Sequence, residues 1–312
     1  MQRRLNDFRN TVLLVNKIKE AKANPVIVLD VIIAGLLTGG IYALLAAGFS
    51  LQYGVSRVLN VSHGEFIMLG AMATYSLYIL FGINPLLSLA IVGPVFFIIG
   101  SLINKILFER IRRLAGSTEV FEGWSILVSF GLLFIIQNIA LLAWGADERG
   151  YTFLAIPINL LGAIFPANRL VGLLLAVVIG LSFFFFLVRT RLGKAIRAAA
   201  QEETGAQLIG VNIRWMHGLC FGFGALLAGF AGVLISTMFT FSPFMGLPYT
   251  IIAIIVVVLG GLGNILGSLV GGLILGLIGS IVLHIEPGLE LAVLYILFML
   301  MLLVRPKGIF GK

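Results

Sequence analysis

The densest group of polar side chains between apolar runs consists of Arg57, Asn60, Ser62, His63 and Glu65. Ionisable groups inside a membrane are costly, and where they occur they tend to line a solute path or hold its gate. The same residues also fit an interfacial turn in which Asn60 or Ser62 caps the next helix and Glu65 lies near its positive end. Both interpretations stay open, because a capped helix break can also line a pathway.

No catalytic or phosphate-binding pattern accompanies this group. His217, His284 and Glu286 lack the spacing of a metal site, and no Ser-His-Asp or HExxH arrangement is visible. The single cysteine, Cys220, lies in an apolar run and is expected to be a small core residue. Because G-x-x-x-x-G-K-[ST] is absent, we expect no enzyme activity and no cofactor on this chain. ATP and Mg²⁺, if they drive its work, belong to a partner ATPase.

The composition requires a membrane as solvent. Of 312 residues, 60% are hydrophobic and 11% are charged, and the mean hydropathy is +1.12. A soluble domain carries about a quarter charged residues. The apolar runs are continuous rather than alternating, which excludes a membrane barrel. The sequence therefore predicts an all-α, polytopic transmembrane helical bundle in a lipid bilayer.

About 20 apolar residues span the hydrocarbon as a helix. Nine runs are candidates, and the short run 248–262 reads as a half-span, so we expect eight or nine spans. The runs are 26–52, 60–82, 85–104, 120–144, 168–188, 215–241, 248–262, 265–284 and 288–304.

The net charge of +8 does not indicate nucleic-acid binding, because the basic residues cluster at the ends of apolar runs. The clusters in 105–113 and 189–214 place both segments on the cytoplasmic side, and 145–167 lies opposite. Three runs separate the basic N-terminus from 105–118. Either the N-terminus therefore lies outside despite its charge, or one run is re-entrant. Residues 1–25 read as a basic amphipathic lead rather than a signal peptide.

A second polar, glycine-rich interruption lies in the other half of the chain. It covers 259–267 and contains Gly260, Gly261, Gly263 and Asn264. Gly-interrupted segments in corresponding halves are typical of transporters built from inverted repeats with broken helices. We therefore expect broken or re-entrant helices, inverted halves, and a gate formed by 53–65 and 259–267.

The segment 189–214 is a polar, basic, Ala-rich helical stretch between two apolar runs. A stiff charged loop of this length is suited to transmit force or information to a soluble partner. It favours a multi-subunit transporter over a self-contained channel or secondary transporter, which would leave the loop without a role.

Four ordered stretches resemble the permease subunits of bacterial branched-chain amino acid (LIV-type) ABC importers. Residues 39–71 contain a match to the Asn-x-[Ala/Ser]-His-Gly-Glu core at Asn60, Ser62, His63, Gly64 and Glu65. Residues 197–212 are similar to the cytoplasmic loop of the family, a relative of the EAA motif. Residues 257–278 and 304–311 resemble its Gly-rich stretch and its tail. The chain departs from the pattern at Arg57, Glu202 and Glu203.

The resemblance implies one permease of a pair, a heterodimer with a paralogous permease subunit, in the bacterial inner membrane. It implies two ABC ATPase subunits and an extracytoplasmic substrate-binding protein as further partners. Residues 26–312 would form the permease domain, and 191–212 a short coupling helix that moves when the ATPases close on ATP. The residues expected to couple the ATPase are Arg197, Ala200, Glu202, Glu203, Gly205, Ala206, Gly210 and Asn212.

A mostly apolar path suits branched-chain or other hydrophobic amino acids. Urea or a short amide would pass the same path, so the substrate class stays open at this stage.

Overall fold

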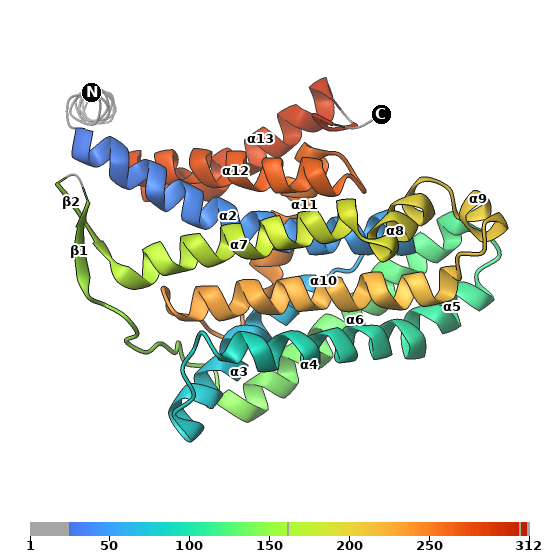
Figure 1. Ribbon diagram of the computed structural model, residues 1–312, viewed down its shortest axis with the longest axis horizontal. Helices are drawn as coiled ribbons and strands as arrows, with labels where there is room; N and C mark the ends of the chain where they lie inside the picture. The colour runs from blue at the N-terminus through green and yellow to red at the C-terminus, as the bar shows by residue number, and fades with distance from the viewer. Residues whose placement is uncertain (1–24, 161, 306, 311–312) are drawn as a thin grey trace, which may run out of the picture.

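The computed structural model describes residues 25–160, 162–305 and 307–310, and residues 1–24 of the predicted basic lead lie outside this part (Figure 1). The elements are α2 (Pro25–Ser56), α3 (His63–Phe81), α4 (Ser88–Ile103), η1 (Asn104–Phe108), α5 (Glu109–Leu114), α6 (Thr118–Trp144), β1 (Pro157–Leu160), β2 (Ala163–Pro166), α7 (Ala167–Arg189), α8 (Arg191–Gln201), α9 (Glu203–Leu208), α10 (Ile213–Ser236), α11 (Gly246–Gly260), α12 (Ile265–Ile285), η2 (Pro287–Leu289) and α13 (Glu290–Val304).

These elements form an all-α polytopic bundle, as the composition predicts. Eight helical segments of the described chain are long and apolar enough to cross a membrane, and α11 is a shorter apolar helix of 15 residues. The described strands are limited to the antiparallel pair β1–β2, in which Pro157 lies opposite Pro166. The predicted connector 105–118 is itself largely helical, because α4 continues through the π-helical turn η1 into α5.

The two ends of the bundle differ in structure and charge. The β1–β2 hairpin marks the left end in Figure 1, called the hairpin end here, and α5, α8 and α9 gather at the right end, called the basic end. Segments 105–113 and 189–214 therefore lie at the same end, as predicted, and 145–167 lies opposite. Helix α2 begins at the hairpin end, so the chain enters the bundle from the end opposite the basic clusters.

The helices repeat in inverted order. Helix α2 runs to the basic end, α3 starts partway back and runs to the hairpin end, and α4 returns along α10 (Figure 1). Helix α10 runs to the hairpin end, α11 starts partway back and runs to the basic end, and α12 returns along α2. Glycines permit close packing in both return pairs, since Gly39 faces Leu273 and Gly100 faces Ala225. These directions confirm the inverted halves.

The second break, after which a half-helix begins inside the bundle, lies at 237–245 between α10 and α11, and the predicted segment 259–267 is a separate interruption between α11 and α12. Residues 259–267 instead make a tight turn between α11 and α12 at the basic end. Glycine is needed there for positive φ, at 102° for Gly261 and 77° for Gly263, and for close packing. The break at 237–245 is largely apolar and follows directly from an apolar helix, so in sequence it resembles a continuation of run 215–241.

Small-residue contacts let us predict which glycines support the bundle. A Cβ on Gly276 would overlap the backbone of Gly39 on α2, whereas one on Gly131 in α6 meets nothing within 4 Å in the described chain. We expect Gly276→Ala to lower stability by about 1–3 kcal/mol, because α12 must move away from α2. Gly131→Ala should be neutral or slightly stabilising. Thermal unfolding of the two variants in detergent tests this prediction. Equal melting temperatures for Gly276→Ala and Gly131→Ala would show that the contact between Gly276 and Gly39 does not support the bundle.

Candidate functional site

The predicted polar cluster lies at the break between α2 and α3. The Nε2 atom of His63 lies 3.1 Å from the carbonyl oxygen of Leu45, eleven residues before the end of α2 at Ser56. At 1.5 Å per residue this contact is about 16 Å from the basic end. The chain therefore turns back along α2 through residues 57–62, and α3 begins inside the bundle.

Backbone without regular structure at this depth must find hydrogen bonds within the protein. Two serines of α6 supply some of them. Ser125 Oγ accepts from Leu59 N at 3.2 Å, and Ser129 Oγ accepts from Val61 N at 3.0 Å. Ser129 Oγ also lies 3.0 Å from the carbonyl oxygen of Leu59. Helix α6 thereby satisfies one side of the break.

Helix α11 satisfies the other side through one hydroxyl group. Thr250 Oγ1 accepts from Gly64 N at 2.8 Å and lies 2.9 Å from the carbonyl oxygen of Val61, to which it can donate. Thr250 belongs to the second half of the chain, and the break belongs to the first half. The two inverted halves therefore meet at this hydroxyl.

The side chains of the break form a buried network of their own. Asn60 Nδ2 donates to Gln52 Oε1 at 3.1 Å, and Asn60 Oδ1 accepts from the backbone N and the Oγ of Ser62 at 3.2 and 2.7 Å. Gln52 Nε2 then donates to the carbonyl oxygen of Phe221 on α10 at 3.2 Å. Asn60, Ser62 and Gln52 are fully buried. Through the bond from Gln52 to Phe221, their network connects the break to α10, a helix of the other half.

His63 and Glu65 are also fully buried, in the first turn of α3. A carbonyl can only accept, so His63 Nε2 carries the proton in its bond to Leu45 and Nδ1 is a free acceptor among the described residues. Both carboxylate oxygens of Glu65 also lack a hydrogen-bond partner there. The carboxylate packs on Gly246, where a Cβ would overlap it. The two half-helices α3 and α11 thus meet start to start.

The second predicted gate segment is not part of this cluster. A Cβ on Gly260 would overlap the backbone of Gly267, and Gly263 packs on Gly54 near the basic end of α2. Asn264 caps α12 by accepting from Gly267 N at 3.0 Å and donates to the carbonyl oxygen of Phe310 at 3.0 Å. Gly261 packs on the tail at Gly308. The geometry therefore gives Gly260, Gly261, Gly263 and Asn264 a place at the basic end, beside the tail.

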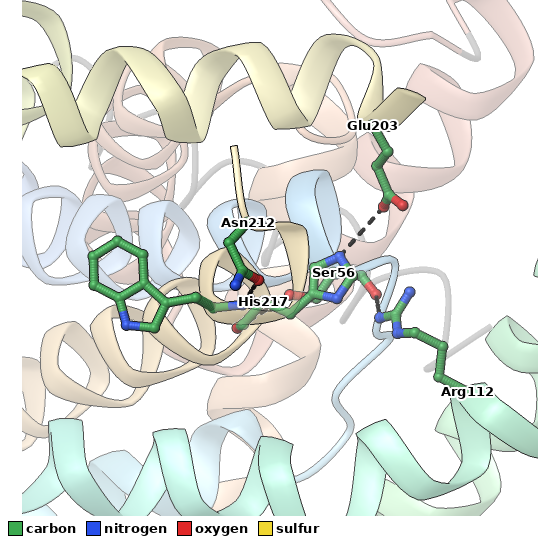
Figure 2. A network of polar contacts seen from close by, with 6 residues as sticks. Ser56, Arg112, Glu203, Asn212 and His217 are labelled. Carbon is green, nitrogen blue, oxygen red and sulfur yellow. Dashed lines mark hydrogen bonds and ion pairs between the residues drawn. The ribbon is translucent and has the colours of Figure 1, made fainter. Parts of the chain in front are cut away.

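A polar network at the basic end joins four helices (Figure 2). Arg112 on α5 donates to the carbonyl oxygen of Ser56, the last residue of α2. Ser56 Oγ lies 3.4 Å from the carbonyl oxygen of His217 on α10, and His217 Nε2 lies 3.4 Å from Glu203 Oε1 on α9. The hydrogen bond from His217 lowers the pKa of Glu203 against the opposing effect of burial, with further help from Arg112. The network connects α9 to the residue directly before the break.

The predicted coupling residues occupy two short helices rather than one. Helix α8 ends where Glu202 adopts extended backbone, with φ −155° and ψ 114°, and α9 follows. Gly205 lies inside α9, whereas Gly210, with φ 87°, makes the turn that follows it. Ala206 is buried, Ala200 is half-buried, Arg197 and Glu202 are exposed, and Asn212 caps α10 by accepting from Trp215 N at 3.1 Å.

The tip of this region presents apolar side chains to the outside. Leu208 and Ile209 are 84% and 76% exposed in the described chain, beside a surface pocket lined by Gln207, Gly210 and Arg214. Both residues lie outside the eight candidate membrane spans, at the end of α9 and before α10.

Sequence reasoning found Asn60–Glu65 but missed their partners Gln52, Ser125, Ser129 and Thr250. They are uncharged polar residues scattered through apolar runs, and such residues are frequent in membrane helices. Arg57 and Glu65, which belong to the same predicted cluster, do not lie together. Arg57 is exposed at the end of α2, with its guanidinium carbon 5.7 Å from the ring centre of Tyr53, and Glu65 is buried.

Comparisons with known proteins find similarity to permease components of branched-chain amino acid transport systems. A family model for the branched-chain amino acid transport system permease component matches residues 31–302, a range that contains both breaks and α8–α9. The high-affinity branched-chain amino acid transport system permease protein BraD of Pseudomonas aeruginosa is 30% identical over 310 residues, covering 91% of this chain and 96% of BraD. LivH of Escherichia coli is 27% identical, covering 89% of this chain and 94% of LivH.

The hydroxyl partners of the break give a testable prediction. Ser129→Ala would leave Val61 N and Leu59 O without their α6 partner, which costs about 1–3 kcal/mol for buried groups. Ser50 is a matched control, since it is equally buried and its Oγ has no partner among the described residues. Thermal unfolding of both alanine variants should show a clear loss for Ser129→Ala and almost none for Ser50→Ala. A similar loss in both would mean that the α6 hydroxyl does not hold the break.

The lowered pKa of Glu203 predicts a pH dependence. A carboxyl group whose folded pKa is depressed stabilises the fold above its unfolded pKa of about 4.3, and this contribution is lost as pH falls through the folded value. Compared at pH 5 and below, the melting-temperature difference between wild type and Glu203→Gln should therefore shrink as pH falls below about pH 4. Glu202→Gln, an exposed neighbour, should show no such trend. A difference for Glu203→Gln that does not change with pH would count against an ionised Glu203.

Proposed function

The chain belongs to the family of branched-chain amino acid transport system permease components, and from this membership we propose that it is the permease subunit of an ATP-driven ABC importer. The substrates proposed are branched-chain and other hydrophobic amino acids, carried across the inner membrane of a bacterium. The observation that carries the proposal is the pair of broken helices, whose starts meet inside the bundle within the range that the family model matches.

The junction of α3 and α11 is the proposed gate. Asn60, Ser62, His63 and Glu65 are fully buried, so the path is closed in this state. Separation of the two half-helices would expose these polar groups to a solute. Substrate affinity need not reside in this path, because a binding protein can supply it, and a lining with few charges is then sufficient.

The segment α8–α9 is the proposed contact with the ATPase. Leu208 and Ile209 would enter a groove of the ATPase, and closure of the ATPase dimer on ATP and Mg²⁺ would move α9. The contacts from Glu203 to His217 and from Arg112 to Ser56 support transmission of this movement to the end of α2. Residues 57–62 of the break follow Ser56 directly in the chain, so a movement of Ser56 would reach them. Gly260, Gly261, Gly263 and Asn264, at the same end, would yield with this movement rather than line the path.

The remaining partners follow the same proposal. A paralogous permease would complete a heterodimer, two ABC ATPase subunits would bind the basic end, and an extracytoplasmic binding protein would bind the hairpin end. A cavity of about 540 Å³ opens at that end, lined by residues that include Tyr151, Asn168 and Thr240. Residues 237–240 of the second break form part of its wall, so a solute released there would contact the segment that leads into α11.

Reconstitution tests this function directly. The chain would be co-purified with the second permease and the ATPases encoded beside it, and placed in proteoliposomes with the binding protein. The proposal predicts ATP-dependent uptake of labelled leucine that excess isoleucine or valine suppresses. Suppression by urea or acetamide alone would move the substrate to small amides. Uptake by the lone chain without ATP would contradict the importer and favour a secondary transporter or channel.

The exposed tip of α9 makes a second prediction. Leu208→Asp with Ile209→Asp should reduce co-purification of the ATPase subunits about tenfold or more, because charges would enter an apolar contact. A matched pair at the hairpin end, Ile156→Asp with Ile164→Asp, alters residues that are 62% and 70% exposed. It should leave the ATPase bound. Retention of the ATPases by the α9 variant would place the contact elsewhere.

A further inference from the structure

Thr250 occupies a position that neither its sequence context nor the family match assigns. It lies one turn into α11 and is fully buried. Its hydroxyl contacts two groups that flank the predicted motif, Val61 O on one side and Gly64 N on the other, at 2.9 and 2.8 Å. The Thr250 side chain, from the second half of the chain, thus serves as the hydrogen-bond partner of two backbone groups in the first half, Val61 O and Gly64 N.

The hydroxyl group has one proton and two acceptors within reach. The carbonyl oxygen of Val61 lies 2.9 Å away, and the carbonyl oxygen of Gly246, four residues earlier in α11, lies 3.4 Å away. A threonine in a helix readily donates to the carbonyl four residues before it. The proton of Thr250 therefore has one acceptor across the junction and a second acceptor within its own helix.

Two glycines beside Thr250 allow the starts of α3 and α11 to approach each other closely. A Cβ on Gly64 would overlap the carbonyl oxygen of Gly246, and one on Gly246 would overlap the carboxylate of Glu65. The first turns of α3 and α11 are therefore in direct contact. Any separation of these turns must break the bonds from Thr250 to Val61 and Gly64 first.

We propose that Thr250 is a positioning residue of the gate, and that its hydroxyl proton transfers its hydrogen bond from Val61 O to Gly246 O when α11 separates from the break. This inference rests on the proposed transport function. The new bond within α11 keeps the hydroxyl satisfied, so the barrier to opening is lower than the loss of a buried hydrogen bond would impose. In the closed position the same hydroxyl holds residues 61–64 in register. Thr250 thus links closure of the gate to the position of α11.

The test compares variants in the complete transporter with its ATPases and binding protein. Thr250→Ser keeps the hydroxyl, and its ratio of leucine transported to ATP hydrolysed should stay within about twofold of wild type. Thr250→Val keeps the volume but leaves Gly64 N and Val61 O unpartnered in the closed state. Its transport per ATP should fall about tenfold, while ATP hydrolysis without substrate persists. If Thr250→Val cannot be purified, Thr250→Cys, with its weak S–H donor, replaces it with the same expectation.

Thr74→Val is the matched control. Thr74 is fully buried on α3, and its hydroxyl donates to Gly70 O of its own helix at 2.8 Å. This variant should keep the wild-type ratio of transport to hydrolysis. A wild-type ratio in Thr250→Val, even with a lower melting temperature, would make Thr250 merely structural and overturn the inference. Wild-type protein that fails to transport in the same assay would instead overturn the proposed function.

Discussion

Residues 57–64 bring unpaired backbone groups into the apolar interior of the bundle, and the rest of the structure is arranged to satisfy them. An amide or carbonyl group without a partner costs several kcal/mol in hydrocarbon, and no water is present there to replace it. The chain solves this with hydroxyl groups from two other helices, Ser125 and Ser129 on α6 and Thr250 on α11. Partners that are side chains, unlike those of a helix ladder, can be exchanged.

The inverted halves follow from the same requirement. A half-helix such as α3 can begin inside the bundle only if another element covers its first turn, and α11 does so for α3 as α3 does for α11. Gly64 and Gly246 allow the two starts to touch. At the basic end, the carbonyl oxygen of Ser56 accepts a hydrogen bond from Arg112, and Ser56 Oγ contacts the carbonyl oxygen of His217. His217 in turn contacts Glu203 on α9, so the residue before the break belongs to the same network as α9. A movement of α9 therefore has a short physical route to the break.

The sequence predicted more of the first half than of the second. Asn60, His63 and Glu65 were visible because ionisable and amide groups are rare in apolar runs. The break at 237–245 was missed because it is mostly apolar and its turn is stabilised by distant contacts, such as the backbone bridge between Arg149 and Phe241. The interruption at 259–267 was visible because of its glycines, which serve positive φ and close packing between α11, α12 and the tail. Thr250 could not have been found from one sequence, since its role depends on a contact 186 residues away in the chain.

Hydrogen exchange of residues 57–64 in the assembled transporter tests the central claim, that this satisfied break is the moving gate. At rest, the amides of Leu59, Val61 and Gly64 should exchange as slowly as those of α10. During ATP turnover with a loaded binding protein, they should lose protection while the amides of α10 keep theirs. Equal and unchanged protection in both segments while leucine is transported would show that the break is a static structural joint.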